Sequence, residues 1–140
     1  MLEFPYVSFE VEFTPNTKRK KTIWRPVVEI IIFRGTKFAA YPVLIDSGAD
    51  YNIFHGDLLL ALGGKLTSGK KRNIFGIGNQ PLKGYEHKAE LKLPGGNKFE
   101  SKAIFSNQIP DYAFGVLGQE GFFDKYDISF NFNRKIITIG

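Results

Sequence analysis

A single carboxylate follows an apolar segment and precedes a tight turn. Residues 41–45 read Tyr-Pro-Val-Leu-Ile, Asp46 comes next, and Ser47-Gly48-Ala49 follows it. Burying an ionised carboxylate costs several kcal/mol unless it is paired or protonated, so a strand that carries one toward an apolar interior usually has a use for it. An Asp-Ser-Gly tripeptide is expected by composition in about one chain in thirty of this length, and most copies are ordinary turns. Asp46 is therefore a candidate acid or base whose role depends on the rest of the chain.

Three further features follow Asp46 in the sequence. Phe75-Gly76-Ile77-Gly78 lies about thirty residues later, Val116-Leu117-Gly118 stands near the end, and Gly121-Phe122-Phe123 follows it. With these features the chain resembles the retropepsin-like aspartic proteases, the single-domain, homodimeric relatives of pepsin. The resemblance covers most of residues 23–140. It implies an all-β, single-domain β-barrel with one or two short helices, active as a two-fold homodimer.

The resemblance implies hydrolysis of peptide bonds by a pair of aspartates. Hydrolysis with water needs a base that takes a proton from the water and an acid that gives one to the carbonyl oxygen. Two carboxylates about 3 Å apart cannot both ionise, so they share one proton and fill both roles, as in the aspartic protease dyad. The chain contains one Asp-Ser-Gly. The second aspartate must therefore come from another copy, on a two-fold axis that places Asp46 beside its own twin.

The same resemblance implies roles for the residues that follow Asp46. The Ser47 hydroxyl would link the two active-site loops across the axis, Gly48 would accept the substrate backbone, and Ala49 belongs to the same supporting loop. Asp50 would hydrogen-bond the peptide further from the scissile bond. We therefore expect residues 46–50 to hold the catalytic acid, its support and one substrate-binding group.

The segment Val116-Leu117-Gly118 would pass under the Asp46 loop. Gly118 would allow close backbone approach, while Val116 and Leu117 would line the substrate pocket. The family usually has an arginine after this glycine, paired with the acid that corresponds to Asp50, whereas this chain has Gln119. An ordinary core strand is the competing interpretation, and the ion pair is in question.

Residues 73–85 form an expected hairpin that the resemblance identifies as a flap over the substrate. Gly76 and Gly78 suit a moving tip, because bare backbone and free φ allow it to hydrogen-bond a substrate. The Ile77 N–H would reach substrate carbonyls through a water, and its side chain would exclude solvent. Asn79 replaces a common flap glycine. A plain β-turn is an equally adequate interpretation of this segment.

Composition excludes several other chemistries. The chain has no cysteine, which rules out disulfides, thiolate metal sites and cysteine nucleophiles. His55 and His87 are too few for a metal site, and no serine nucleophile elbow is present. We expect no metal and no cofactor.

Charge and hydropathy limit the partners. The formal net charge of +5 is densest at Lys18–Lys21 and Lys70–Arg72, both beside turn-forming residues. Such runs are usually solvated loop tips, so we expect no nucleic-acid binding. No stretch approaches about 18 uncharged apolar residues, and the first residues lack a secretory pattern, so we expect no membrane span and a cytoplasmic location.

The elements that must position Asp46 are mostly strands. Alternation predicts a strand at residues 6–13, and two further strands at 23–33 and 38–45 make a hairpin. A short helix is expected at 57–62, capped by the Asp57 carboxylate and stopped by Gly63-Gly64. Two hairpins are expected at 73–105, a single helical turn at 121–126, and two last strands around residue 133. Trp24 and the phenylalanines are expected in the core.

Three functions compete. The first is a homodimeric aspartic endopeptidase that cuts extended peptides, built from a domain at residues 23–140 with an extension at 1–22. The second is a catalytically weak dimerisation or peptide-binding domain of the same fold. The third, a nucleic-acid-binding β-barrel, rests only on the charge. The extension could be an extra edge strand, a dimer-swapped arm or a pro-segment.

Overall fold

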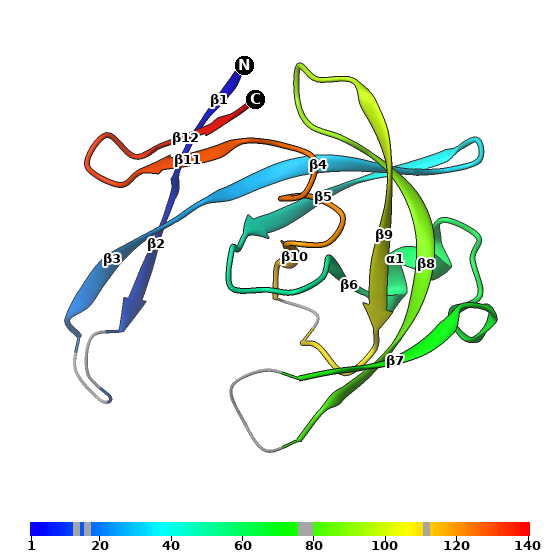
Figure 1. Ribbon diagram of the computed structural model, residues 1–140. Coiled ribbons are helices and arrows are strands. Elements are labelled where there is room, and N and C mark those ends of the chain that lie inside the picture. Colours follow the sequence, from blue (N-terminus) through cyan, green and yellow to red (C-terminus); the bar gives the residue numbers. More distant parts are fainter. Residues whose placement is uncertain (13–14, 16–17, 76–79, 111–112) are drawn as a thin grey trace.

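The computed structural model describes residues 1–12, 15, 18–75, 80–110 and 113–140 (Figure 1). In this part of the chain strands dominate, beside one short helix, α1 (Gly56–Ala61), and one 3-10 turn, η1 (Leu66–Ser68). These elements confirm the all-β fold class. The strands, in chain order, are β1 (Leu2–Pro5), β2 (Val7–Glu12), β3 (Lys20–Arg25), β4 (Val27–Arg34), β5 (Lys37–Ile45), β6 (Ile53–His55), β7 (Lys70–Ile74), β8 (Leu82–Lys92), β9 (Lys98–Ser106), β10 (Gly115–Leu117), β11 (Ile128–Asn131) and β12 (Ile136–Ile139).

The largest sheet has seven strands, in the order β4-β5-β10-β6-β9-β8-β7. Strand β4 also pairs with β8, so the sheet folds back on itself (Figure 1). Most neighbouring strands are antiparallel, but β10 runs parallel to β5 and β6 runs parallel to β9. Parallel neighbours need a long connection between them, so these two pairs join segments that are distant in the sequence. Both pairs lie next to the loops that follow β5.

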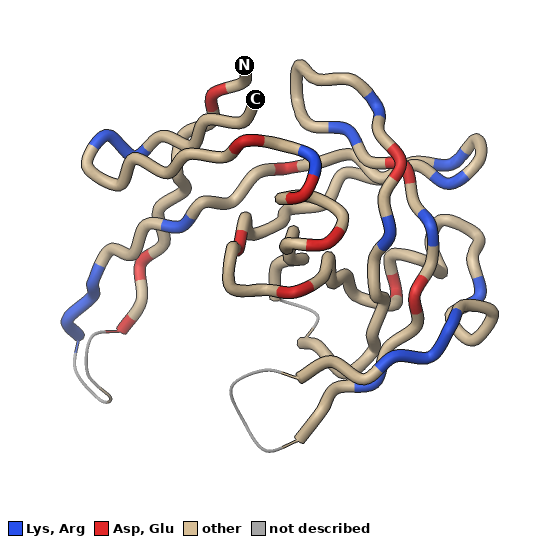
Figure 2. The backbone as a smooth tube through the Cα atoms, viewed as in Figure 1, with Lys and Arg blue, Asp and Glu red and all other residues tan. Residues whose placement is uncertain are grey.

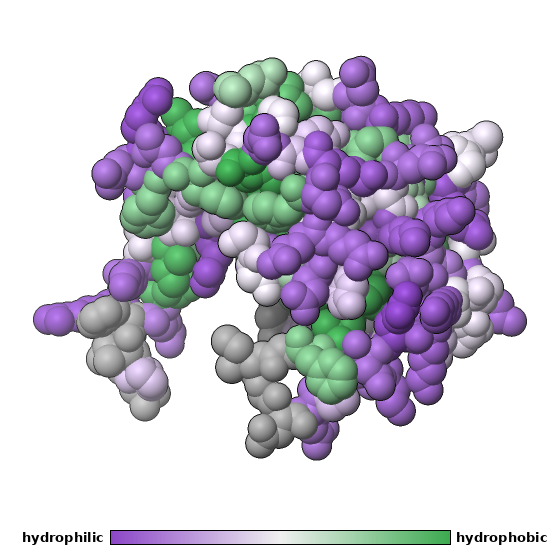
Figure 3. All heavy atoms as spheres, in the orientation of Figure 1, coloured by the Kyte–Doolittle hydropathy of each residue, from purple (hydrophilic) through white to green (hydrophobic). Residues whose placement is uncertain are grey.

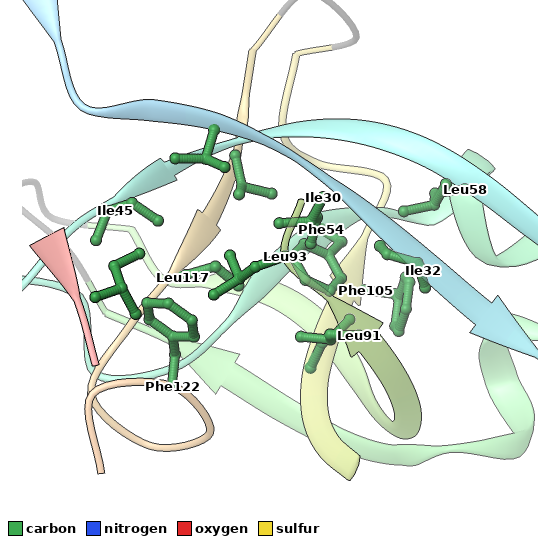
Figure 4. Packing of buried hydrophobic residues seen from close by; sticks show 14 of the residues in the cluster. Ile30, Ile32, Ile45, Phe54, Leu58, Leu91, Leu93, Phe105, Leu117 and Phe122 are labelled. Atoms are coloured by element: carbon green, nitrogen blue, oxygen red, sulfur yellow. The ribbon is translucent and has the colours of Figure 1, made fainter. Parts of the chain in front are cut away.

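The core fills the inside of this folded sheet. In β4 the side chains of Val28, Ile30 and Ile32 are buried at alternate positions, as expected for a strand with one inner face. Figure 4 shows side chains from β4, β5, β6, β8, β9 and β10 gathered around Phe54 and Phe105. Because the end of β5 and all of β10 are anchored in this core, the turn that follows β5 has a rigid base.

The two chain ends lie side by side in a second sheet of order β1-β12-β11 (Figure 1). Strands β2 and β3 form a third, two-stranded sheet that projects from the body, and we call residues 7–25 the arm. The boundary expected after residue 22 falls inside β3. Pro26 separates β3 from β4, since it has no N–H to continue a strand ladder.

The expected turns are confirmed where the structure describes them. The β4–β5 hairpin turns at Gly35 and the β8–β9 hairpin at Gly95, both with positive φ. Strands β7 and β8 pair antiparallel on either side of the expected flap tip. The tip itself, residues 76–79, lies outside the described residues.

The short helix and five aromatic positions differ from expectation. Helix α1 begins one residue earlier than expected, and His55 is its N-cap: the His55 ring nitrogen accepts a hydrogen bond from the Asp57 N–H. The expected capping carboxylate, Asp57, lies instead in the first turn of the helix. Five aromatic residues expected in the core are exposed instead: Trp24, Phe38, Phe75, Phe130 and Phe132. They lie in or next to hairpins, and the alternation of side chains along a hairpin does not show which of its faces the rest of the protein covers.

Candidate active site

Asp46 lies directly after β5, at a point where two parallel strands end together. Leu117 of β10 is the register partner of Ile45, and the Asp46 N–H donates to the Leu117 carbonyl at 3.0 Å. Ile45 and Leu117 are both buried, because both strands enter the apolar core. The backbone of Asp46 is therefore held by the core, while its side chain begins the turn.

The turn itself folds around the Asp46 side chain. The Gly48 N–H donates to Asp46 Oδ1 at 2.9 Å, and the Ala49 N–H donates to the Asp46 carbonyl at 3.2 Å. Asp46 is half-buried, whereas Ser47 and Gly48 are exposed. A backbone N–H that points at the carboxylate sets its orientation. The arrangement presents one oriented carboxylate at an accessible loop.

Asn52 joins this loop to β10 and β9 from beneath. Its Oδ1 accepts from the Gly118 N–H at 2.9 Å, and its Nδ2 donates to Ser101 Oγ at 2.9 Å and to the Lys102 carbonyl at 3.0 Å. Ser101 Oγ in turn donates to the Gly121 carbonyl at 2.7 Å. Asn52 is fully buried, so these bonds form away from water and fix the spacing between the two loops. Asn52 was not predicted from the sequence, in which it stands as a single amide between Tyr51 and an apolar segment.

Gly118 allows the two loops to touch. A Cβ at this position would lie 2.5 Å from the Tyr51 carbonyl oxygen and 2.7 Å from the Ala49 carbonyl oxygen. The Gln119 N–H donates to that Ala49 carbonyl at 2.9 Å, and the Glu120 N–H donates to the Asp50 carbonyl at 2.9 Å. Only glycine fits this close backbone approach.

Gln119 makes a neutral contact with the Asp46 loop. Its side-chain amide donates to the Ser47 carbonyl at 2.8 Å. Within the described residues, the exposed Asp50 carboxylate has no hydrogen-bond or ion-pair partner. The loop is thus tethered through Ser47, and the Asp50 carboxylate is left facing solvent.

The structure brings together most of the residues expected to form the site. Residues 46–50 form one turn, and β10 supports it through Val116 and Leu117. Leu117 is fully buried in the core, so Val116, which is half-buried, supplies the apolar surface of this strand. Gly76, Ile77 and Gly78 lie outside the described residues. The described residues 70–74 and 82–92 on either side form a paired hairpin stem.

Other polar groups lie apart from this turn. His87 Nε2 is 2.9 Å from the Leu66 carbonyl, and His55 caps α1. The described residues contain no cluster of three or more His, Asp or Glu side chains arranged to hold a metal ion. An open hollow of about 490 Å³ is lined by the β4–β5 turn, β8, β9 and residues 120–125, and residues 46–50 do not line it. No described helix is long and apolar enough to span a bilayer.

Comparison with known proteins identifies the fold. A crystal structure of a retropepsin-like aspartic protease from Rickettsia conorii matches with a TM-score of 0.54 and 18% identity, over 81% of this chain and 90% of that one. The EIAV protease complexed with the inhibitor HBY-793 matches with a TM-score of 0.48 and 21% identity, over 76% of this chain and 88% of that one. No family model matches the sequence, and no curated protein does. The chain therefore has the retropepsin-like fold expected from its motifs.

Proposed function

We propose that this protein is an aspartic endopeptidase in which two copies of Asp46, one from each protomer of a homodimer, activate a water for peptide hydrolysis. The observation that carries the proposal is the Asp46 turn. Its carboxylate is oriented by the Gly48 N–H, and its backbone is held by Leu117 at the end of a parallel strand pair. The fold match supports the same assignment.

In this mechanism the two carboxylates share one proton between them. One removes a proton from the attacking water while the other donates to the carbonyl oxygen of the scissile bond. Val116 offers apolar surface to a substrate side chain, with Leu117 fixing the strand beneath it. Asp50, exposed on the same turn, accepts hydrogen bonds from the substrate backbone further out. The flap role of Gly76, Ile77 and Gly78, over the extended peptide, is part of this proposal by resemblance to the family alone.

The test is cleavage of a mixed peptide library by the purified chain between about pH 4 and pH 7, the range in which a shared-proton pair works. We expect products that a pepstatin-like inhibitor suppresses and that Asp46→Asn abolishes. Asp57→Asn, an exposed aspartate in the first turn of α1, is the matched control and should leave cleavage unchanged. If Asp46→Asn cleaves as well as the parent chain, the proposal is wrong. Peptide binding without cleavage would favour the weakly catalytic alternative, for which Gln119 in place of arginine is the structural motive.

A further inference from the structure

The arm has one apolar face that the body covers only in part. Register pairs Phe9 with Ile23 and places Val7 and Val11 on the same face of the hairpin. Phe9 packs on Phe114, just before β10, with ring centroids 5.3 Å apart. Val7 and Val11 stay 39% and 37% exposed. A two-stranded hairpin is marginally stable on its own, so this apolar row needs a further partner.

The arm borders a hollow beside the candidate active site (Figure 3). Figure 3 shows open space between the arm and the body, with apolar surface on the arm. Strand β5 ends on the side of the body that faces the arm, so the Asp46 turn lies toward the same space (Figure 1). The Phe9–Phe114 contact holds the base of the arm next to β10. A partner that filled this hollow would lie between the arm and the side of the body where β5 ends.

The charges on the two sides of this hollow are opposite. The arm, residues 7–25, carries five basic and two acidic residues, a net charge of +3. The loops at 46–52 and 119–127 carry five acidic residues and one basic residue, a net charge of −4. Figure 2 shows the basic segments along β3 and the acidic segments in the loops after β5 and β10. A two-fold contact would place the basic arm of each copy against the acidic loops of the other copy. The dimer would then contain two such contacts between opposite charges.

We propose that the arm clasps a second copy of this chain, packing the inner face of Val7, Phe9, Val11 and Ile23 against the partner near its Asp46 turn. The inference rests on the proposed function, because that function requires two Asp46 turns to meet. It adds the surface that brings them together, and it gives residues 7–25 a role that catalysis by residues 46–50 does not use. The partner completes the site by contributing the second Asp46.

The test measures the dimer dissociation constant by sedimentation over a range of concentrations. We expect a dimer of twice the 15.8 kDa chain mass. Val11→Asp should raise the dissociation constant at least about 30-fold, the usual effect of disrupting a buried contact at the centre of an interface. Val11 is exposed in the single chain, so the variant should fold, which circular dichroism checks. Phe38→Asp, another exposed apolar strand position on a distant hairpin, is the control and should leave the dissociation constant unchanged.

A charge-reversal pair tests the electrostatic part. Lys18→Glu combined with Arg19→Glu should raise the dissociation constant about tenfold at low salt, with a smaller effect at high salt because ions screen exposed charges. Lys88→Glu combined with Lys102→Glu makes the same charge change on β8 and β9 and should have no effect.

The outcomes separate this inference from the proposed function. If the parent chain is a dimer and both arm variants keep its dissociation constant, the clasp is wrong while the dyad still stands. Arm variants that stay dimeric but cleave peptides more slowly would also overturn the clasp, since the arm would then contact substrate. A monomeric parent chain overturns the clasp and also the two-copy dyad on which the clasp rests. The cleavage result for Asp46→Asn tests the proposed function independently of the arm.

Discussion

The side-chain oxygen of Asn52 accepts a hydrogen bond from the backbone N–H of Gly118, 66 positions along the chain, at 2.9 Å. This bond joins the segment that carries Asp46 to the segment that ends β10. Both groups are buried, so neither finds water when the bond is broken. The Asn52 amide is thus the buried side chain that helps to hold the Asp46 turn against the end of β10, beside the backbone bonds between the two segments.

Replacement of this amide should destabilise the protein. Asn52→Leu leaves the buried Gly118 N–H without its acceptor and removes the amide that donates to Ser101 Oγ, and we expect a loss of about 2–4 kcal/mol in the free energy of unfolding. Urea denaturation followed by fluorescence measures it. Asn133→Leu, at an exposed turn position, should change the value by less than about 0.5 kcal/mol. An Asn52→Leu chain as stable as the parent would show that the buried clamp is dispensable.

Gly118→Ala should disrupt the same junction from the other side. The added Cβ would meet the carbonyl oxygens of Tyr51 and Ala49 at 2.5 Å and 2.7 Å, and both are backbone atoms that cannot rotate away. We expect a destabilisation of about 2–3 kcal/mol and loss of peptide cleavage, because the Asp46 turn must move. Gly140→Ala serves as control, since its nearest neighbour would be a flexible Met1 side-chain atom at 3.6 Å. Thermal unfolding and cleavage assays compare the two, and equal behaviour would contradict the close-approach argument.

Gln119 should matter for catalysis more than for stability. Gln119→Glu replaces the donor to the Ser47 carbonyl with a carboxylate of the same shape, close to Asp46 and Asp50. We expect kcat/KM for a peptide substrate to fall about tenfold or more, because a loosened loop misplaces the catalytic carboxylate. Gln119→Arg keeps a donor and supplies a partner for the Asp50 carboxylate, so it should retain activity. If Gln119→Glu cleaves the peptide as well as Gln119→Arg and the parent chain do, the hydrogen bond from Gln119 to Ser47 has no catalytic role.

Alkaline unfolding should reveal the environment of Tyr41. Burial raises the pKa of this phenol above its ordinary value of 10.0, and the hydrogen bond that its oxygen accepts from the His55 N–H lowers it by a smaller amount. Because the folded-state pKa is the higher one, this contribution to stability is complete below about pH 10 and is lost as pH rises through the folded-state value.

Tyr41→Phe isolates that contribution. At pH 7 we expect a loss of about 1 kcal/mol, since the His55 N–H loses its acceptor. Above pH 10 the variant should lose stability less steeply than the parent, although the pKa values of Tyr6 and Tyr126, also raised by burial, keep part of the slope. Urea denaturation from pH 7 to pH 11 gives both curves. Parallel curves throughout would mean that Tyr41 does not couple ionisation to folding.

Local patterns predicted the strands and most turns around the site. Alternating side chains marked β2, and glycines marked the turns at Gly35 and Gly95. Asp46 after an apolar strand, followed later in the sequence by Val116-Leu117-Gly118, indicated the retropepsin-like fold. Each of these signals depends on a few adjacent residues, so the sequence carries them directly.

Only the tertiary structure decided how distant segments meet. The parallel pairing of Leu117 with Ile45, the clamp at Asn52 and the exposure of Trp24 on the arm all depend on which surfaces face one another across the fold. The sequence does not distinguish a buried asparagine from an exposed one, and it does not show which strand pairs with which. Burial and strand pairing are properties of the assembled core. The sequence therefore determined that this chain carries one well-placed carboxylate, and the packing of strands far apart in the chain determined how it is held.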